Sequence, residues 1–114
     1  NTKLIFNICI NYGGHSEIVD TTKKLCQKVV SGEMNIEDID DESFKQHLYQ
    51  DLPPIDLLIR TSGEYRISNF MLWQLSYSEF YFTDVLFPDF DEKEFDKAVT
   101  AYYQRDRKFG GVKL

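Results

Sequence analysis

The sequence predicts an α/β fold with a mainly parallel sheet flanked by helices. Short apolar runs at residues 4–10 and 55–59 are each followed by a glycine turn and then by a segment with helical spacing. The 42% hydrophobic and 28% charged content is typical of a folded protein, and 114 residues suffice for one core. About three strands are visible, fewer than a parallel sheet usually has, so we expect the fold to be incomplete in this chain.

The first half of the chain predicts one strand and two helices. Residues 4–10 form a continuous apolar run, as in a buried strand of a parallel sheet. Ser16 is the expected cap of the next helix, and Gly32 is its expected stop. A short helix is expected to start near Asp40 or Asp41. The predicted apolar stripe of the long helix consists of Ile18, Val19, Thr22, Leu25, Cys26, Val29 and Val30.

The second half predicts two strands and two helices. Residues 55–59 are the next expected strand, and a helix is expected over about residues 69–76. The aromatic residues 80–82 are expected to be extended. Asp91 followed by Glu94 resembles a capping box and predicts the start of the last helix. The predicted apolar stripe of that helix consists of Phe95, Ala98, Val99, Tyr102 and Tyr103.

Composition excludes several classes of function. The net charge of −6 argues against nucleic-acid binding, which needs a basic surface. No apolar stretch is long enough to cross a bilayer, and no signal-peptide pattern is present. Cys9 and Cys26 are expected to be core thiols of a reducing compartment. His15 and His47 lack zinc-like spacing, so we expect no structural metal.

The most informative candidate site lies between the second predicted strand and the helix after it. Arg60 ends the strand, a glycine turn follows, and Arg66 comes just before Ser68, which with Asn69 can cap the helix. Guanidinium forks and a helix N-terminus together favour phosphate oxygens. The sequence therefore predicts a diphosphate site formed by Arg60, Arg66 and Ser68. The alternative is that either arginine pairs with Glu64, since such surface pairs are common and nearly neutral in energy.

Asn11 and Glu79 are two further candidates. Asn11 follows the first predicted strand, at the edge where parallel sheets bind ligands, and can orient a substrate group or close the turn. Glu79 lies eleven residues beyond Ser68, about 16 Å away along an unbroken helix. It could not touch a phosphate held at Ser68 of the same chain. Either the helix bends, or Glu79 serves elsewhere, or it reaches a site in another subunit.

Five segments, in this order and spacing, resemble the cis-prenyltransferases, and within them the bacterial undecaprenyl diphosphate synthases. They are Asn-Tyr-Gly-Gly at 11–14, Arg-Thr-Ser-Gly-Glu-Tyr-Arg-Ile-Ser-Asn-Phe at 60–70, Tyr-Ser-Glu-Phe-Tyr-Phe at 77–82, Pro-Asp-Phe at 88–90 and Arg-Asp-Arg-Lys-Phe-Gly-Gly at 105–111. The likeness covers essentially the whole chain. It implies a parallel sheet wrapped by helices, a hydrophobic tunnel for the growing product, and usually a homodimer.

The resemblance also implies an activity and its partners. Such enzymes extend farnesyl diphosphate, an allylic diphosphate, by successive cis condensations with isopentenyl diphosphate, and they require magnesium. The product is a membrane-associated lipid, the carrier for peptidoglycan in cell-wall synthesis. The enzyme is expected in the cytoplasm, with a peripheral place at the inner membrane face as an option.

Site roles follow residue by residue from the motif match. Arg60, Arg66 and Ser68 would bind the diphosphate of isopentenyl diphosphate. Asn11 matches a catalytic asparagine near the reacting groups, and Glu79 matches an acid linked to magnesium. Gly110 matches a glycine of the tail segment, which would reach the partner subunit's site through backbone N–H groups.

The sequence departs from the family pattern at three positions, and it lacks the family's N-terminal motif. His15 stands where arginine is usual, Lys108 replaces an arginine, and Phe87 replaces a tryptophan. The family's N-terminal Asp-Gly-Asn-Gly-Arg-type motif, whose aspartate binds magnesium, is absent. We therefore expect residues 1–114 to be the C-terminal portion of a single cis-prenyltransferase domain, inactive by itself. Two alternatives remain, a non-catalytic partner subunit of a two-component prenyltransferase and a simple anion-binding α/β module.

Overall fold

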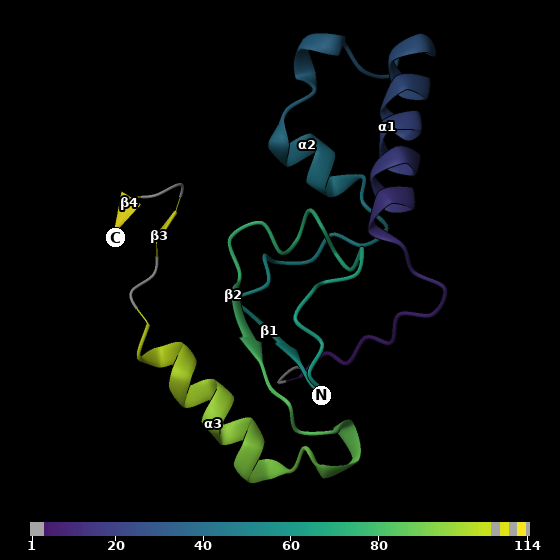
Figure 1. Cartoon of the computed structure of the whole chain (residues 1–114). Coiled ribbons are helices and arrows are strands. Elements are labelled where there is room, and N and C mark those ends of the chain that lie inside the picture. The colour runs from purple at the N-terminus through teal and green to yellow at the C-terminus, as the bar shows by residue number, and fades with distance from the viewer. Residues whose placement is uncertain (1–3, 106–107, 110–111, 114) are drawn as a thin grey trace. The chain divides into compact units, whose positions relative to one another are not determined.

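The structure is a computed structural model that describes residues 4–105, 108–109 and 112–113 (Figure 1). The chain divides into two compact units, which are described one at a time. The first unit holds the chain up to Leu52 together with Asn69–Met71. The second holds Pro53–Ser68 and the chain from Leu72 onward.

The main helix of the first unit is α1, Gly14–Val30 (Figure 1). The predicted stop is confirmed, because the helix ends at Val30, Ser31 is its C-cap, and Gly32 follows with a positive φ of 83°. The predicted cap at Ser16 is wrong. The chain enters the helix at Gly13, so Ser16 already lies inside the first turn.

The buried face of α1 differs from the predicted apolar stripe. Glu17, Thr21 and Leu25 are buried and recur every four residues, so they form one face. Only Leu25 belongs to the predicted stripe. Val19 and Cys26 are exposed. Cys26 follows Leu25 and is rotated from it by about 100°, and Val19 lies two residues from both Glu17 and Thr21, on the far side of the helix. The expectation of a core thiol at Cys26 is therefore wrong.

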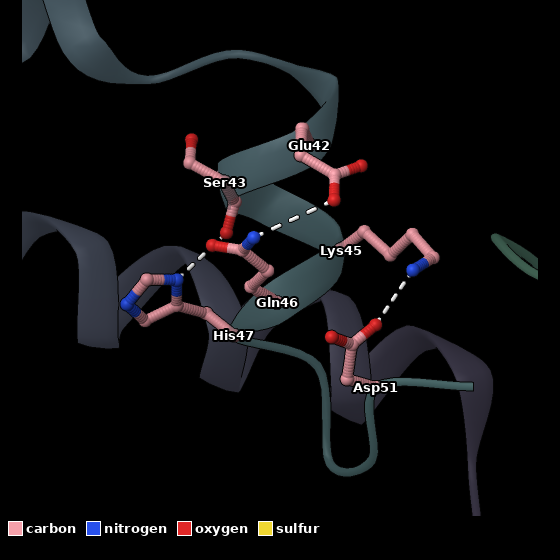
Figure 2. Close-up of polar contacts among 6 residues, drawn as sticks. All are labelled: Glu42, Ser43, Lys45, Gln46, His47 and Asp51. Atoms are coloured by element: carbon pink, nitrogen blue, oxygen red, sulfur yellow. Dashed lines mark hydrogen bonds and ion pairs between the residues drawn. The ribbon is translucent and has the colours of Figure 1, made fainter. Parts of the chain in front are cut away.

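The second helix of this unit is α2, Asp41–Gln46, and its predicted start is confirmed. Asp40 caps it by accepting a hydrogen bond of 2.8 Å from the backbone N–H of Ser43. Figure 2 shows the polar contacts that hold its last turn and the loop beyond. They are Gln46 Nε2 to Glu42 Oε1 at 3.4 Å, His47 Nδ1 to the Ser43 carbonyl at 2.7 Å, and Lys45 Nζ to Asp51 Oδ1 at 2.6 Å.

The two helices α1 and α2 of the first unit lie next to each other, and a hydrogen bond links them. Thr21 Oγ1 on α1 donates to the carbonyl of His47 just after α2, at 3.3 Å. Leu48, the next residue, is buried. A short 3-10 helix, η1, spans Ile36–Asp38 between α1 and α2.

The strand predicted at residues 4–10 does not form. A strand exists only through ladder hydrogen bonds to a neighbour, and this segment pairs with no strand among the described residues. Cys9 is exposed with the rest of the run, so the expectation of a core thiol there is also wrong. The large apolar side chains of the run, each 71–80% exposed, are Leu4, Ile5, Phe6, Ile8 and Ile10.

The second unit is built on two parallel strands, β1 (Leu57–Arg60) and β2 (Glu79–Phe82). Leu57 pairs with Glu79 at one end, and Arg60 pairs with Phe82 at the other. The predicted strands and their parallel direction are confirmed, with boundaries moved by one or two residues. This pairing sets Arg60 at the carboxyl end of β1, where parallel sheets present their loops.

The helix predicted over about residues 69–76 is wrong, because this segment is a series of turns. The φ angles of Ser68, Asn69 and Met71 are 49°, 64° and 46°. These values belong to the left-handed region, which a right-handed helix cannot contain. Ser68 therefore does not lie at the N-terminus of a helix, so no helix dipole favours an anion there.

The last helix, α3 (Glu92–Tyr103), packs against β2, and its Ala98 has no exposed surface. The 3-10 helix η2, Phe87–Asp89, precedes it. Two members of the predicted stripe, Phe95 and Tyr103, are exposed instead. Beyond α3 a short antiparallel hairpin pairs β3 (Lys108–Phe109) with β4 (Val112–Lys113).

Replacing Asp91 by alanine is expected to destabilise the protein by about 1 kcal/mol, a typical cost for an N-cap. The Asp91 carboxylate accepts a hydrogen bond of 3.0 Å from the N–H of Glu94, which confirms the predicted start of α3. Urea unfolding of Asp91→Ala beside Asp96→Ala tests this, because Asp96 is an exposed acid within the same helix. Equal losses in the two variants would contradict a capping role.

Candidate active site

One guanidinium nitrogen joins three of the predicted site residues. Arg60 Nη1 donates to the backbone carbonyl of Arg66 at 2.7 Å and to Ser68 Oγ at 3.0 Å. Arg60 itself is fixed by β1, and its carbonyl accepts from the N–H of Thr83 at 3.0 Å. The structure thus brings Arg60, Arg66 and Ser68 together on one loop at the carboxyl end of β1.

The side chain of Arg66 forms an ion pair with the carboxylate of Glu64. This is the pairing with Glu64 that the sequence left open as the alternative to an anion site, and it is present for Arg66. The Arg66 side chain nevertheless remains 66% exposed, so most of the guanidinium faces solvent. An exposed pair of this kind is worth little, and an incoming anion can exchange with the carboxylate at small cost.

The loop that carries Arg66 is anchored to the segment after β2. Ser62 and Gly63 donate backbone hydrogen bonds to the carbonyls of Val85 and Thr83, at 2.8 and 2.9 Å. Gly63 has a φ of 72°, and a Cβ there would lie 3.2 Å from Asp84 Oδ1. A side chain at this position would meet both backbone strain and crowding, so glycine is needed for the loop to lie so close.

Tyr65 and Asp84 form a side-chain link in the same loop that sequence analysis missed. The Tyr65 hydroxyl donates to the Asp84 carboxylate, and this hydrogen bond raises the pKa of the tyrosine. The Tyr65 ring lies 5.7 Å from the Phe82 ring, centroid to centroid. Nineteen residues separate Tyr65 from Asp84, so only the parallel pairing of β1 with β2 makes the contact.

Glu79 lies at the opposite end of the strand pair from Arg60. It opens β2, three residues before the partner of Arg60, which is about 10 Å along a strand. Glu79 and the Arg60–Ser68 contact therefore lie at opposite ends of the strand pair. The helix that the sequence predicted between Ser68 and Glu79 does not form. Arg105 Nη1 approaches its carboxylate at 3.4 Å and donates to the carbonyl of Phe80 at 2.5 Å.

A magnesium role for Glu79 would need ligands from elsewhere. Within the described part of the chain, no three His, Cys, Asp or Glu side chains gather to hold a metal ion. Magnesium at phosphate sites is commonly held by one or two carboxylates, with substrate phosphates and waters as the other ligands. A single carboxylate at Glu79 fits that pattern only together with a diphosphate.

Asn11 belongs to the first unit, where it is exposed and has a φ of 53°. The next residue, Tyr12, donates through its hydroxyl to the carboxylate of Glu17, which is only 2% exposed. The other oxygen of Glu17 accepts from the backbone N–H of Tyr49 at 3.0 Å. Burial and the neighbouring Glu17 raise the pKa of Tyr12, so its hydroxyl stays protonated and able to donate.

Asn69 caps α1 and not a helix of its own. Its backbone carbonyl accepts from Gly14 N–H at 2.7 Å, and its Oδ1 accepts from His15 N–H at 2.8 Å. These are two of the N–H groups that every helix start leaves without a partner inside the helix. The sequence recognised Asn69 as a capping residue from its type, but the helix it caps lies 54 residues earlier. Gly110, the remaining predicted site residue, lies outside the described residues.

A prenyltransferase family model, described as putative undecaprenyl diphosphate synthase, matches residues 1–110. The chain belongs to this prenyltransferase family. It is 53% identical over 98% of its length to a ditrans,polycis-undecaprenyl-diphosphate synthase of Haemophilus influenzae, of which it covers 47%. It is 56% identical over 99% of its length to an isoprenyl transferase of Fusobacterium nucleatum, of which it covers 46%.

Solved structures place this prenyltransferase chain in the same fold. Lavandulyl diphosphate synthase from Lavandula x intermedia, in complex with dimethylallyl diphosphate, matches with a TM-score of 0.83 and 47% identity. That match covers 89% of this chain and 44% of the other. A probable undecaprenyl diphosphate synthase from Campylobacter jejuni matches with a TM-score of 0.73 and 34% identity, over 89% of this chain and 45% of the other.

The chain spans about half the length of the curated relatives it matches. Its α/β fold is correspondingly an incomplete version of the prenyltransferase fold. Among the described residues, no helix combines the length and the apolar character needed to cross a bilayer.

Proposed function

We propose that this chain is the C-terminal portion of a cis-prenyltransferase domain and that it binds isopentenyl diphosphate. The observation that carries the proposal is the single Arg60 nitrogen that holds both Ser68 Oγ and the Arg66 carbonyl. This arrangement brings the Arg60 guanidinium, the Ser68 hydroxyl and the backbone of Arg66 together at the carboxyl end of a parallel strand. Such groups match the oxygens of a diphosphate, and the family membership supports this choice of ligand.

The proposed site binds its anion against the overall charge of the chain. The net charge is −6, so long-range attraction does not bring a diphosphate to the surface. Binding must come from local contacts with Arg60, Arg66 and Ser68. The Arg66 guanidinium would exchange Glu64 for a phosphate oxygen, with a larger gain because a diphosphate carries more charge than one carboxylate.

In the complete enzyme, we propose condensation of isopentenyl diphosphate with farnesyl diphosphate in cis, toward undecaprenyl diphosphate. The allylic diphosphate leaves, the isopentenyl double bond attacks the resulting cation, and a proton is lost. Arg60, Arg66 and Ser68 hold the nucleophile by its diphosphate, which is a positioning and electrostatic contribution. Bound magnesium would supply charge neutralisation at the diphosphates, and Glu79 would provide one of its carboxylate ligands.

The remaining proposed roles come from the likeness to the family. Asn11, whose backbone is turned into the left-handed region after the first apolar run, would act near the reacting groups. Gly110 would contribute backbone N–H groups to the site of a second subunit in a homodimer. The allylic diphosphate would bind to the half of the domain that the relatives have in addition. The product would be a membrane-associated lipid made by a cytoplasmic enzyme or one peripheral to the inner face of the membrane.

A non-catalytic partner subunit is the main competing function. Such a subunit has no need for an organised diphosphate site. The Arg60 contacts to Ser68 and Arg66 are intact here, which favours the substrate-binding function. Binding of isopentenyl diphosphate decides between the two.

Replacing Arg66 by alanine is expected to raise the dissociation constant for isopentenyl diphosphate about tenfold. The loss is moderate because the side chain is exposed and already paired with Glu64. Calorimetric titration of the protein that carries this chain measures it. The matched control is Lys97→Ala, since Lys97 is also 66% exposed and pairs with Glu94 at 2.8 Å on α3. Equal affinity in Arg66→Ala and the parent would remove Arg66 from the site.

A further inference from the structure

We propose that Tyr65 is a positioning residue for isopentenyl diphosphate, acting through its hydrogen bond to Asp84; the inference rests on the proposed function. Tyr65 directly precedes Arg66, an exposed member of the proposed site. Its hydroxyl donates to the Asp84 carboxylate, which belongs to the segment after β2. The link therefore ties the Arg66 end of the loop to the strand pair that also fixes Arg60.

Backbone hydrogen bonds hold the first part of the loop. Ser62 and Gly63 are bonded to Val85 and Thr83. At the far end, the backbone of Arg66 is held through its carbonyl by Arg60 Nη1. Between these anchors, the Tyr65 side chain reaches Asp84 and thus fixes the residue that leads into Arg66.

The ring of Tyr65 places this link beside the Arg60 anchor. It lies against the ring of Phe82, and Phe82 is the register partner of Arg60 in the β1–β2 pair. The Tyr65 side chain thus contacts the strand that pairs with Arg60, and Tyr65 itself is the residue before Arg66. Holding both arginines before the ligand arrives lowers the ordering cost of binding, which is the basis of preorganisation.

Tyr65 does not hold the loop by being buried, because its side chain is 59% exposed. An exposed tyrosine without a partner would sample several rotamers, and the loop would gain freedom with it. The hydroxyl bond to Asp84 is what selects one orientation. Removing only that hydroxyl should therefore change ligand binding while leaving the fold in place.

The test compares Tyr65→Phe, Asp84→Ala and the double variant in the protein that carries this chain, because alanine removes the acceptor of the Tyr65 hydroxyl. We expect Tyr65→Phe to raise the dissociation constant and the KM for isopentenyl diphosphate about three- to tenfold, as for the loss of one hydrogen bond. The kcat at saturating substrate and the midpoint of thermal unfolding should stay at parent values. The double variant should bind no more weakly than Tyr65→Phe alone, because both changes break the same link.

The matched control is Tyr49→Phe. The Tyr49 hydroxyl likewise donates to an exposed acid, Asp20, at 2.6 Å, and Tyr49 is 46% exposed, but it lies in the first unit. Parent-like binding by Tyr49→Phe, with weakened binding by Tyr65→Phe, supports the inference. Parent-like binding by Tyr65→Phe, or losses that multiply in the double variant, would overturn it.

Arg66→Ala in the same titrations separates this inference from the function on which it rests. If Arg66→Ala weakens binding and Tyr65→Phe does not, only the positioning role of Tyr65 fails. If neither variant changes the affinity, the isopentenyl diphosphate site itself is misplaced and both proposals fail.

Discussion

Replacing Arg60 by alanine is expected to raise the dissociation constant for isopentenyl diphosphate about 100-fold, or about 2.7 kcal/mol. The effect exceeds that of Arg66 because one Arg60 nitrogen organises two other groups. Without it, Ser68 Oγ and the Arg66 carbonyl both lose their donor. The variant thus removes a charge and also releases the loop that presents Arg66. Titration of the protein that carries this chain, with parent and variant at the same salt concentration, measures the loss.

Arg60→Lys separates the charge of Arg60 from its geometry. Lysine keeps the positive charge, but its ammonium lacks the planar guanidinium that presents several donors in fixed directions. We expect its affinity to fall between those of the parent and Arg60→Ala. An Arg60→Ala protein that unfolds like the parent and binds isopentenyl diphosphate within twofold of it would refute the proposed site.

Replacing Glu17 by alanine is expected to lower the free energy of unfolding by about 2 kcal/mol. Glu17 is buried, and its two oxygens accept from the Tyr12 hydroxyl and the Tyr49 backbone N–H. Truncation leaves both donors without this acceptor, although relief of the buried charge offsets part of the cost. Urea unfolding at neutral pH measures the difference.

The pH dependence of this network follows from Tyr12. Its pKa is raised in the folded protein, so folding favours the protonated hydroxyl. That contribution is fully present below the ordinary tyrosine pKa of about 10 and is lost only as pH rises above the folded value. The cost of Glu17→Ala should therefore be the same between about pH 7 and 9.

Asp20→Ala is the control for Glu17, because Asp20 lies on the same helix and also accepts a tyrosine hydroxyl. Its bond to Tyr49 is 2.6 Å long, but the pair is exposed. We expect a cost below about 0.5 kcal/mol, as for most surface substitutions. A similar loss in both variants would mean that the burial of Glu17 is not what makes it important.

Local signals in the sequence were sufficient for the helices that begin at capping residues. Asp40 and Asp91 each accept from the N–H three residues on, as their residue type and spacing predicted. Arg60, Arg66 and Ser68 were likewise recognised from chemistry and spacing along one short loop. Each of these features depends on atoms within about eight residues of one another, so a local pattern can encode it.

Features that depend on distant partners were predicted poorly. The apolar run at residues 4–10 has the composition of a strand, yet no strand forms because it pairs with none among the described residues. Asn69 was recognised as a cap but assigned to the wrong helix. Glu17 was not singled out by the sequence, and only the contacts of Tyr12 and Tyr49 explain its burial.

The sequence by itself determined the fold class, the family and the three residues of the loop for which we propose diphosphate binding, because periodicity, caps and motif spacing are local properties. Only the tertiary structure decided how that loop is held. It replaced a helix N-terminus at Ser68 with left-handed turns, and it joined Tyr65 to Asp84. The reason is physical: these contacts join residues brought together by strand pairing, and their energy does not depend on neighbours in sequence.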